Sequence, residues 1–388
     1  MASLGVYLHV PFCERVCPYC DFAVVAARTL PEATEDRYVG ALLRELDLRR
    51  EAFAGHRLAS VYFGGGTPAL LRPASIERLL GAVVAAFPAD GEPEVTLEAN
   101  PSTLERGRLP GFRAAGVSRL SLGVQSFDDG VLRRLGRAHR SGAAREAIRA
   151  ARGAGFANLS LDLIFAAPGQ DEAALERDLD EVIAFAPEHA SAYSLTVEPG
   201  TPFAKAAARG QLKVPDEDRA AGMMERVAER LEAAGLRAYE ISSFARPGFE
   251  AAHNARYWQR LPVLGLGVGA WSTDPRTPGT PWGVRRANPR SLDAWLAAVL
   301  AGREAAAEVE VLDLRTARGE AAFLALRTRR GLDARGYARE FGAPPRAHYG
   351  DAIDRLCASG LLAESADGDL ALTPAGRLLA DSVFVHFV

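Results

Sequence analysis

Three cysteines lie close together near the start of the chain, at Cys13, Cys17 and Cys20, in the segment HVPFCERVCPYCDF. Cysteine thiolates are the usual ligands of iron–sulfur clusters, and a four-iron [4Fe-4S] cluster normally takes four of them. Three cysteines therefore leave one iron without a protein ligand. Such an iron can bind a small molecule and take part in its chemistry, so this segment predicts a reactive cluster site.

Zinc is the alternative metal for this segment. A structural zinc site needs four ligands, and His9 or Asp21 could complete the set. However, the C-x3-C-x2-C spacing differs from the paired spacing of zinc ribbons, and no second cysteine pair follows. Cys357 lies far along the chain in an amphipathic segment and is expected to be a small, buried apolar residue. The iron–sulfur interpretation is therefore favoured.

The composition is that of a globular protein of two or three domains. The chain has 388 residues, of which 48% are hydrophobic and 24% are charged. A net charge of −3 offers no basic excess for a nucleic-acid partner. We find no secretory signal and no apolar run of about 18 residues. We expect a cytoplasmic protein whose thiols are free to bind metal; peripheral membrane contact stays compatible with the sequence.

Short apolar strands alternate with amphipathic helices over the first part of the chain, residues 1–200. The predicted strands are residues 6–10, 60–65, 94–99, 119–124, 159–165 and 190–196, and the predicted helices include 37–53, 74–87, 143–155 and 173–186. This alternation predicts an α/β fold with a parallel sheet and helical crossovers. Six such units suit a partial (β/α)6 TIM-like barrel, in which ligands bind at the carboxyl ends of the strands.

The rest of the chain predicts two further regions. Residues 201–305 form a less regular connecting region with a Gly/Pro-rich stretch at 262–289. Residues 306–388 read as a small α+β domain in which helices precede a hairpin, with its turn near Asp367–Gly368 and a last helix from Pro374. This order is typical of a winged helix. The domain lacks a basic recognition helix and carries several acidic residues, so we do not expect it to bind DNA.

A glycine run follows one predicted strand, and three polar residues are expected at the ends of others. Gly64, Gly65 and Gly66 would let a ligand approach the backbone, although such a run is more often a tight turn. An acid or amide inside an apolar strand is costly unless it is paired. Taken alone, each would be a satisfied interior residue, but three on successive strands indicate a shared ligand. They are Glu98, Gln125 and Asp162.

Arg137, in the segment RLGRAHR, could pair bidentately with a carboxylate of that ligand. Alternatively it is an ordinary surface arginine among several.

The segments YLHVPFCERVCPYCDF and YFGGGTP resemble the radical S-adenosylmethionine (SAM) superfamily. This resemblance implies that the open iron binds the methionine end of SAM, and that one electron from the cluster cleaves SAM to a 5′-deoxyadenosyl radical. With LEANP, GVQSF and the C-terminal domain, the chain is similar over nearly its whole length to oxygen-independent coproporphyrinogen III oxidases. The positions that match the oxidase's SAM-binding residues are Tyr7, Tyr19, Gly65, Gly66, Thr67, Glu98, Gln125, Arg137 and Asp162.

Two departures distinguish the chain from the oxidase and resemble the HemW-type haem chaperones instead. The oxidase has a further cysteine two residues past the cluster motif, where this chain has Phe22. The oxidase also has a longer extension before the motif. In addition, the segment HNARYW matches the H-N-x-x-Y-W signature of haem binding in these chaperones, at His253, Asn254, Tyr257 and Trp258.

The HNARYW segment also has a physical interpretation. Histidine is a common axial ligand of haem iron, and Tyr257 and Trp258 offer flat amphipathic surfaces for a porphyrin. Arg256 could meet a propionate. The alternative is a histidine at a turn with two aromatic residues in the core, and only the cysteine motif tips the balance toward haem.

The resemblance therefore implies a haem chaperone that binds haem, a [4Fe-4S] cluster and SAM, and transfers haem to an acceptor, expected to be a respiratory haemoprotein. A homodimer is compatible with this function. The alternatives are an oxygen-independent coproporphyrinogen III oxidase, which decarboxylates its substrate by a radical route, and a radical enzyme that acts on haem itself. Whether the chain is an enzyme stays open at this stage.

Overall fold

The structure is a computed structural model that describes residues 3–388 and, at residues 103 and 104, the backbone alone. Its centre is a sheet of parallel strands that lie side by side in chain order. These strands are β1 (Ser3–Val10), β4 (Arg57–Gly65), β5 (Glu94–Ala99), β6 (Arg119–Gln125), β7 (Asn158–Phe165) and β8 (His189–Ser194). They confirm the six predicted strands to within three residues at each end.

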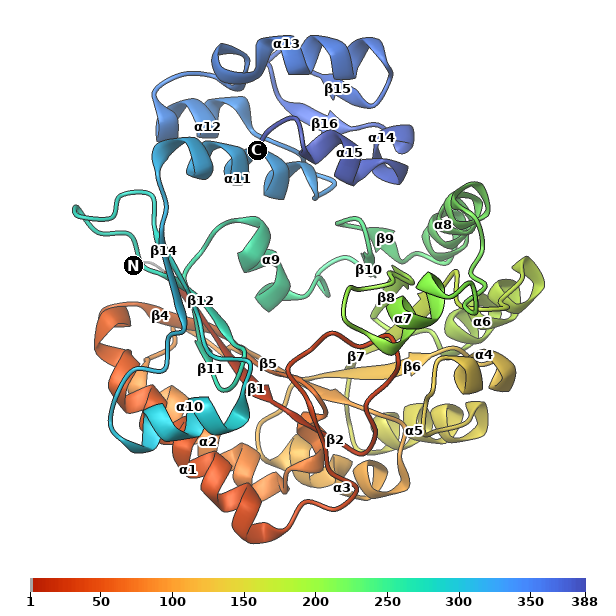
Figure 1. Cartoon of the computed structure of the whole chain (residues 1–388), viewed down its shortest axis with the longest axis vertical. Coiled ribbons are helices and arrows are strands. Elements are labelled where there is room, and N and C mark those ends of the chain that lie inside the picture. Colours follow the sequence, from red (N-terminus) through yellow and green to blue (C-terminus); the bar gives the residue numbers. More distant parts are fainter. Residues whose placement is uncertain (1–2) are drawn as a thin grey trace.

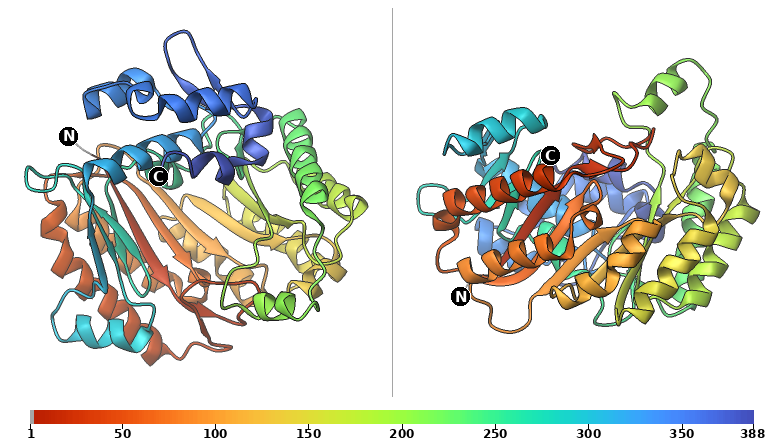
Figure 2. Two further views of the ribbon diagram at one scale, coloured as in Figure 1. Left: turned by 45° about the horizontal axis from the view of Figure 1, so that its top comes forward. Right: turned by 90° about the horizontal axis from the view of Figure 1, so that it is seen from below.

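Helices cover the outer face of this sheet, and the strands form a curved wall inside them (Figures 1 and 2). The helices are α1 (Glu32–Arg49), α2 (Pro73–Ala86), α3 (Thr103–Ala114), α4 (Asp129–Arg134), α5 (Ser141–Gly153), α6 (Glu172–Phe185) and α8 (Glu217–Ala233). Helix α7 (Pro202–Ala208) lies instead beside the cysteine loop, where the N–H of Phe203 donates to the carbonyl of Pro18 (3.0 Å). Short 3-10 turns follow α1 (Arg50–Phe53) and precede α2 (Pro68–Leu70). The predicted partial barrel is confirmed.

Side chains alternate between the two faces of each strand. On β6, Leu120 and Leu122 are buried in the apolar core beneath the helices, whereas Arg119, Ser121 and Gln125 border an internal cavity. A strand exposes successive side chains on opposite faces. The sheet therefore separates an apolar outer layer from a polar interior, which we call the lumen.

The Gly/Pro-rich region joins the same sheet, which the sequence did not indicate. β11 (Val263–Leu266) runs parallel to β1, and β12 (Trp271–Asp274), β13 (Val284–Ala287) and β14 (Glu308–Val311) follow in antiparallel order. At the other edge, β10 (Ser243–Ala245) and β9 (Arg237–Ala238) extend β8. Among residues 3–388 the two edge strands, β14 and β9, do not pair, so the barrel is open.

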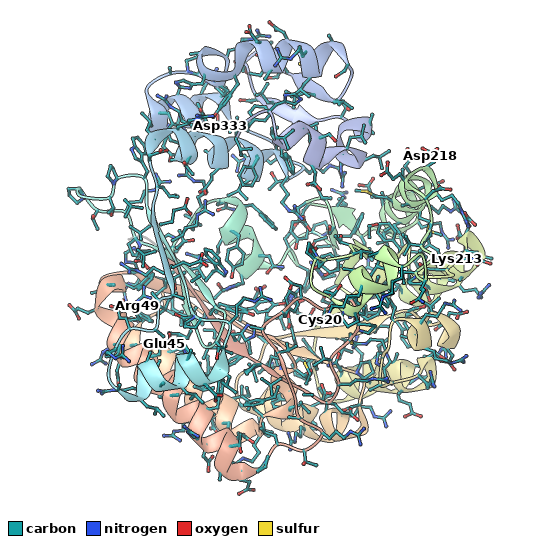
Figure 3. All side chains as sticks on the ribbon, viewed as in Figure 1. Cys20, Glu45, Arg49, Lys213, Asp218 and Asp333 are labelled. Carbon is teal, nitrogen blue, oxygen red and sulfur yellow. The ribbon has the colours of Figure 1, made fainter. Side chains whose placement is uncertain are left out.

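A buried carboxylate on α1 ties this helix to the extension. Glu45 accepts hydrogen bonds from the backbone N–H of Gly267 (2.7 Å), from Asn288 (2.6 Å) and from the indole of Trp295 on α10 (Leu292–Leu300; 3.1 Å). Figure 3 shows Glu45 and Arg49 together on the α1 side of the molecule, away from Cys20. Gly267 packs so closely on β1 that a Cβ there would lie 2.7 Å from the carbonyl oxygen of His9. Glu45 thus fixes the strand end from which the cysteine segment departs.

The C-terminal domain has its own apolar core. It contains α11 (Leu314–Leu326), α12 (Ala334–Phe341), α13 (Pro345–Ala358), β15 (Leu362–Glu364), β16 (Leu370–Leu372), α14 (Pro374–Leu378) and α15 (Ala380–Phe384). The hairpin turns at Gly368, whose φ is 85°, and a helix begins at Pro374 as predicted. Three helices followed by a hairpin confirm the winged-helix-like order. None of the described helices is long and apolar enough to cross a membrane.

Glu45 predicts a distinctive dependence of stability on pH. Burial raises its pKa to about 7, although its hydrogen bonds act in the opposite direction. Between the unfolded value of about 4.5 and 7, the folded state therefore holds more protons than the unfolded state, so this group's contribution to stability falls as the pH rises. Relative to Glu45→Gln, the wild type should lose on the order of 3 kcal/mol of unfolding free energy across this window.

Urea unfolding of both proteins at intervals from pH 4.5 to 7.5 measures this difference. Glu51→Gln, at an exposed position just past α1, is the matched control and should follow the wild type. Parallel pH profiles for wild type and Glu45→Gln would contradict the prediction.

Candidate functional site

The three cysteines lie on the loop that follows β1, at the carboxyl end of the barrel. Two short paired strands, β2 (Phe12–Cys13) and β3 (Val25–Ala26), close the base of this loop. The N–H of Ala27 donates to the carbonyl of Cys13 (2.7 Å), and that of Cys20 donates to the carbonyl of Cys17 (3.1 Å). All three thiols are free, partly buried and on the wall of one cavity. Cys357 lies apart from them on α13, as expected, but it is only partly buried at the edge of the C-terminal core and not fully buried.

Polar side chains contact two of these thiols. The hydroxyl of Thr67 lies 3.6 Å from the sulfur of Cys13, and the guanidinium of Arg137 lies 3.5 Å from that of Cys17. Arg137 also donates to the hydroxyl of Tyr19 (3.4 Å) and to the carbonyl of Gly123 (3.0 Å). Arg137 is therefore a residue of the site and not an ordinary surface arginine.

The thiol environment suits a metal cluster. Burial raises the pKa of Cys13 to about 11 and raises that of Cys20, so these groups are neutral thiols without metal. Across residues 3–388, no three histidine, cysteine or acidic side chains already surround one point at metal-binding distance. Metal sites commonly form as the ligands lose protons to the bound metal. Three free thiols on one loop beside a cationic guanidinium fit a [4Fe-4S] cluster with one open iron.

The glycines after β4 are required by the protein's own packing. Gly65 has a φ of 104°, and a Cβ there would lie 2.5 Å from the ring of His9. A Cβ on Gly66 would lie 2.8 Å from the backbone of Pro11 and Phe12. Both glycines also border the cavity. They hold the start of the cysteine loop against the end of β4, in addition to leaving room for a ligand.

Two carboxyl groups point into the lumen from neighbouring parts of the sheet. Glu98 accepts hydrogen bonds from the hydroxyl of Tyr62 (2.7 Å) and the N–H of Gly65 (3.2 Å). Asp162 accepts from Ser121 (2.8 Å) and from Ser160 (3.1 Å). Burial and their mutual repulsion raise the pKa of Glu98 to about 7, and burial raises that of Asp162. Asp162 lies in the middle of β7 and not at its end.

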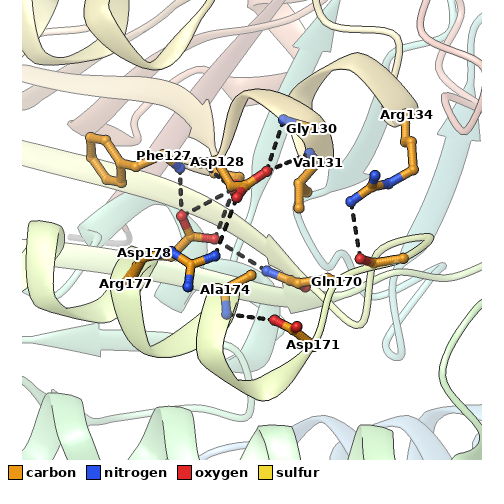
Figure 4. Close-up of polar contacts among 12 residues, drawn as sticks. Phe127, Asp128, Gly130, Val131, Arg134, Gln170, Asp171, Ala174, Arg177 and Asp178 are labelled. Carbon is orange, nitrogen blue, oxygen red and sulfur yellow. Dashed lines mark hydrogen bonds and ion pairs between the residues drawn. The ribbon is translucent and has the colours of Figure 1, made fainter.

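Gln125 ends β6 with a φ of 65°, a conformation that an adjacent network holds in place (Figure 4). Asp178 of α6 accepts hydrogen bonds from the hydroxyl of Ser126 (2.8 Å), the N–H of Phe127 (2.5 Å) and the amide of Gln170 (3.1 Å). This carboxylate is buried and therefore fixes the backbone that immediately follows Gln125. The sequence analysis did not single out Asp178, because it occupies an ordinary position on an amphipathic helix.

One cavity of about 930 Å³ runs from the cysteine loop into the lumen. This volume is near the upper end of the range for ligand pockets, ~300–1,000 Å³. The predicted site residues on its wall are Cys13, Cys17, Tyr19, Cys20, Gly65, Gly66, Thr67, Glu98, Gln125, Arg137, Asp162 and Asn254. Polar residues that sequence reasoning missed are Tyr62, Asn100, Arg119, Ser121, Ser191 and Tyr193. These residues alternate with apolar residues along the strands, and this alternation is the signal from which they could have been predicted.

The HNARYW segment forms helix α9 (Ala252–Trp258), which lies between the barrel strands and the C-terminal domain (Figure 1). The carboxylate of Glu94, at the start of β5, accepts hydrogen bonds from the N–H groups of Ala252 and His253 (both 3.1 Å). Helix α9 therefore sits at the amino ends of the strands. Asn254 borders the cavity from this side, so we call α9 the floor helix.

His253 points into the protein and uses both ring nitrogens. Its Nδ1 lies 3.0 Å from the hydroxyl of Ser60 and its Nε2 lies 3.1 Å from that of Tyr257. The side chain is only 1% exposed, and burial lowers its pKa to about 3, so the ring is neutral. Its ring lies near those of Tyr7 and Tyr62, in tilted arrangements with 6.3 and 5.2 Å between ring centres. Tyr7 thus lies beside the floor helix and outside the cavity wall.

The other floor-helix residues contact neighbouring segments. Arg256 is buried and donates to the backbone carbonyls of Ser3 and Pro262, so it is a structural residue here. The guanidinium of Arg327, from the C-terminal domain, lies 4.6 Å from the centre of the Trp258 ring. Just past the helix, Arg260 forms an ion pair with Glu340 of α12 (2.8 Å).

A partial parallel barrel with a three-cysteine loop at its carboxyl end defines a radical SAM protein. The model of the radical SAM superfamily matches residues 7–182, and that of the HemN C-terminal domain matches residues 312–379. The solved structure of coproporphyrinogen III oxidase (HemN) from Escherichia coli has a TM-score of 0.83. It is 24% identical, with 100% of this chain and 90% of that chain covered. This likeness supports the fold.

Within this superfamily the chain belongs to the HemW family. Heme chaperone HemW of Bacillus subtilis (strain 168) is 32% identical over 99% of both chains. Heme chaperone HemW of Mycobacterium tuberculosis (strain ATCC 25618 / H37Rv) is 38% identical over 98% of this chain and 93% of its own. The protein of the same name from Escherichia coli (strain K12) is 39% identical over 70% of each chain.

Asp178 offers a test of how Gln125 is positioned. Asp178→Asn replaces one of the two acceptor oxygens by an NH2 group that can only donate, so the three donors Ser126, Phe127 and Gln170 can no longer all be satisfied. We expect a loss of about 2–3 kcal/mol of unfolding free energy and weaker SAM binding, because the backbone beside Gln125 loses its anchor. Chemical denaturation and calorimetric SAM titration measure the two effects. Asp180→Asn, exposed on the same helix, should change stability by no more than about 1 kcal/mol; equal effects would contradict this prediction.

The cysteines offer a direct test of the cluster. Anaerobically prepared wild type should contain about four irons per chain, and alanine at Cys13, Cys17 or Cys20 should remove nearly all of this iron. Cys357→Ala is the matched control and should keep it, because this thiol lies in the C-terminal domain. Metal and acid-labile sulfide analysis measures the outcome. Stoichiometric zinc with negligible iron would contradict the cluster assignment.

Proposed function

We propose that this chain is a haem chaperone that binds haem together with a [4Fe-4S] cluster and SAM, and transfers haem to an acceptor protein. The observation that carries the proposal is the position of the HNARYW segment. One residue of this segment, Asn254, borders the cavity at the end opposite the three cysteines. The relatives named heme chaperone HemW, at 32–39% identity, support the same function.

In this proposal the cysteine loop and the upper lumen bind the cofactors. Cys13, Cys17 and Cys20 would hold the cluster, and Arg137 beside Cys17 would meet the SAM carboxylate at the open iron. Glu98, Gln125 and Asp162 point into the same space and offer acceptors to SAM, with Tyr19, Gly65, Gly66 and Thr67 around them. When bound, the cluster supplies one-electron reduction of SAM. Tyr7 would act only through its contacts with His9 and Tyr62.

Haem is the cargo, and the floor helix would bind it. The His253 ring is neutral, which is the form that ligates a metal. Its Nε2 faces the hydroxyl of Tyr257 at 3.1 Å. Ligation of haem iron by this atom would therefore replace that hydrogen bond by a bond to iron. Asn254 already borders the lumen, and Trp258 offers a flat aromatic surface, over which the Arg327 guanidinium lies.

The expected partners follow from this function. Haem and a haem-acceptor protein, such as a respiratory haemoprotein, are the proposed partners. Delivery to such an acceptor would suit a cytoplasmic protein that makes peripheral contact with a membrane, and a homodimer is compatible with handover. The C-terminal domain is proposed as a protein-facing domain and not a nucleic-acid-binding one.

Anaerobic haem titration tests the proposal. Wild type should bind one haem per chain, and His253→Ala should weaken binding about tenfold or more, because an axial ligand is lost. His386→Ala, exposed near the C-terminus, is the matched control and should bind like the wild type. Transfer to an apo-haemoprotein should follow binding. Undiminished binding by His253→Ala would remove this residue from the site, and anaerobic decarboxylation of coproporphyrinogen III would favour the oxidase instead.

A further inference from the structure

Arg119 is a buried cation at the lower end of the lumen. It begins β6 and points to the same side as Ser121 and Gln125, because these residues alternate along one strand and all border the cavity. Arg119 and Gln125 are six positions apart, a distance of about 20 Å along the strand. Arg119 therefore lies well below the end of the barrel where the cysteines and Arg137 gather.

The guanidinium of Arg119 has no hydrogen bond or ion pair with any described residue. The side chain is only 2% exposed, and its Nε is buried without a partner. The two nearest carboxyl groups already accept hydrogen bonds from other donors, namely Tyr62 and Gly65 for Glu98, and serines for Asp162. A buried donor without an acceptor is costly, so this position calls for an acceptor that a ligand brings.

The register of the sheet places Arg119 in the same row as residues that contact the floor helix. Tyr7, Tyr62, Thr96 and Arg119 are successive partners across β1, β4, β5 and β6 and form one row. The rings of the two tyrosines lie 6.3 and 5.2 Å from that of His253. The charge of Arg119 is also one of the causes that lower the pKa of His253. The cation and the HNARYW segment thus meet in the same part of the lumen.

We propose that Arg119 binds a carboxylate group of the ligand that enters the lower lumen and that this group is a propionate of haem, an inference that rests on the proposed function. A guanidinium matches a carboxylate bidentately. A monoanion suits the site better than a phosphate dianion, because Glu98 and Asp162 stand on the adjacent strands. Arg137 lies at the upper end of the cavity, where it would bind the SAM carboxylate. The two arginines would therefore bind two different carboxylate groups.

The test compares haem with its dimethyl ester, in which both propionates are blocked. Wild type should bind haem about 10- to 100-fold more tightly than the ester, as expected for a charged hydrogen-bonded pair. Arg119→Gln should bind both with similarly low affinity, and Arg119→Lys should lie between. SAM affinity, measured by calorimetry, should be unchanged in both variants. Arg133→Gln, exposed on α4, is the matched control and should keep the wild-type preference for haem.

Several outcomes would overturn the inference. Equal binding of haem and its dimethyl ester by the wild type would overturn it. This measurement does not depend on whether Arg119→Gln folds. Retention of the preference by Arg119→Gln would also overturn it. Loss of SAM affinity in this variant would assign Arg119 to the SAM site instead. Each of these outcomes leaves haem binding by the wild type intact, whereas absence of haem binding by the wild type would overturn the proposed function itself.

Discussion

Everything in this molecule depends on keeping polar groups inside a barrel whose outer face is apolar. Residues such as Leu120 and Leu122 are buried under helices, whereas their neighbours Arg119 and Ser121 face the lumen. Desolvated carboxyl groups are costly unless they are hydrogen-bonded. Glu98 and Asp162 meet this condition through hydroxyl and backbone donors on the same and adjoining strands. The sheet can therefore hold a preformed polar cavity without collapsing around it.

The same constraint explains which structural elements could be predicted from the sequence. The six parallel strands and their helices were predicted because each carries a strong periodic pattern. β11, β12 and β13 were not, because each is only four residues long and lies in a Gly/Pro-rich region. Pairing of β11 with β1 and antiparallel pairing of the three strands with one another create them. Helix α12 (Ala334–Phe341) was also missed, since it is short and sits between two longer helices.

The candidate site could be predicted from the sequence to a degree similar to that of the fold. The cysteine loop and most of the residues matched to SAM binding border one cavity, as local motifs predicted. Asp178 and Arg119 were not identified, because their roles arise from long-range contacts. Asp178 on α6 supports the backbone that follows β6, and Arg119 is brought near the floor helix by the register of the strands. His253 was identified by motif, yet its burial against Ser60 and Tyr62 depends on how a distant helix closes the barrel.

The contacts of Trp258 and Arg260 with the C-terminal domain have a mechanical consequence. Arg327 stacks on the indole, and Glu340 pairs with Arg260, so the floor helix is gripped by the strands on one side and by the small domain on the other. Any outward displacement of the floor helix must therefore break its contacts with the barrel and with the C-terminal domain together. The small domain thus braces the segment that carries Asn254 at the lower end of the cavity.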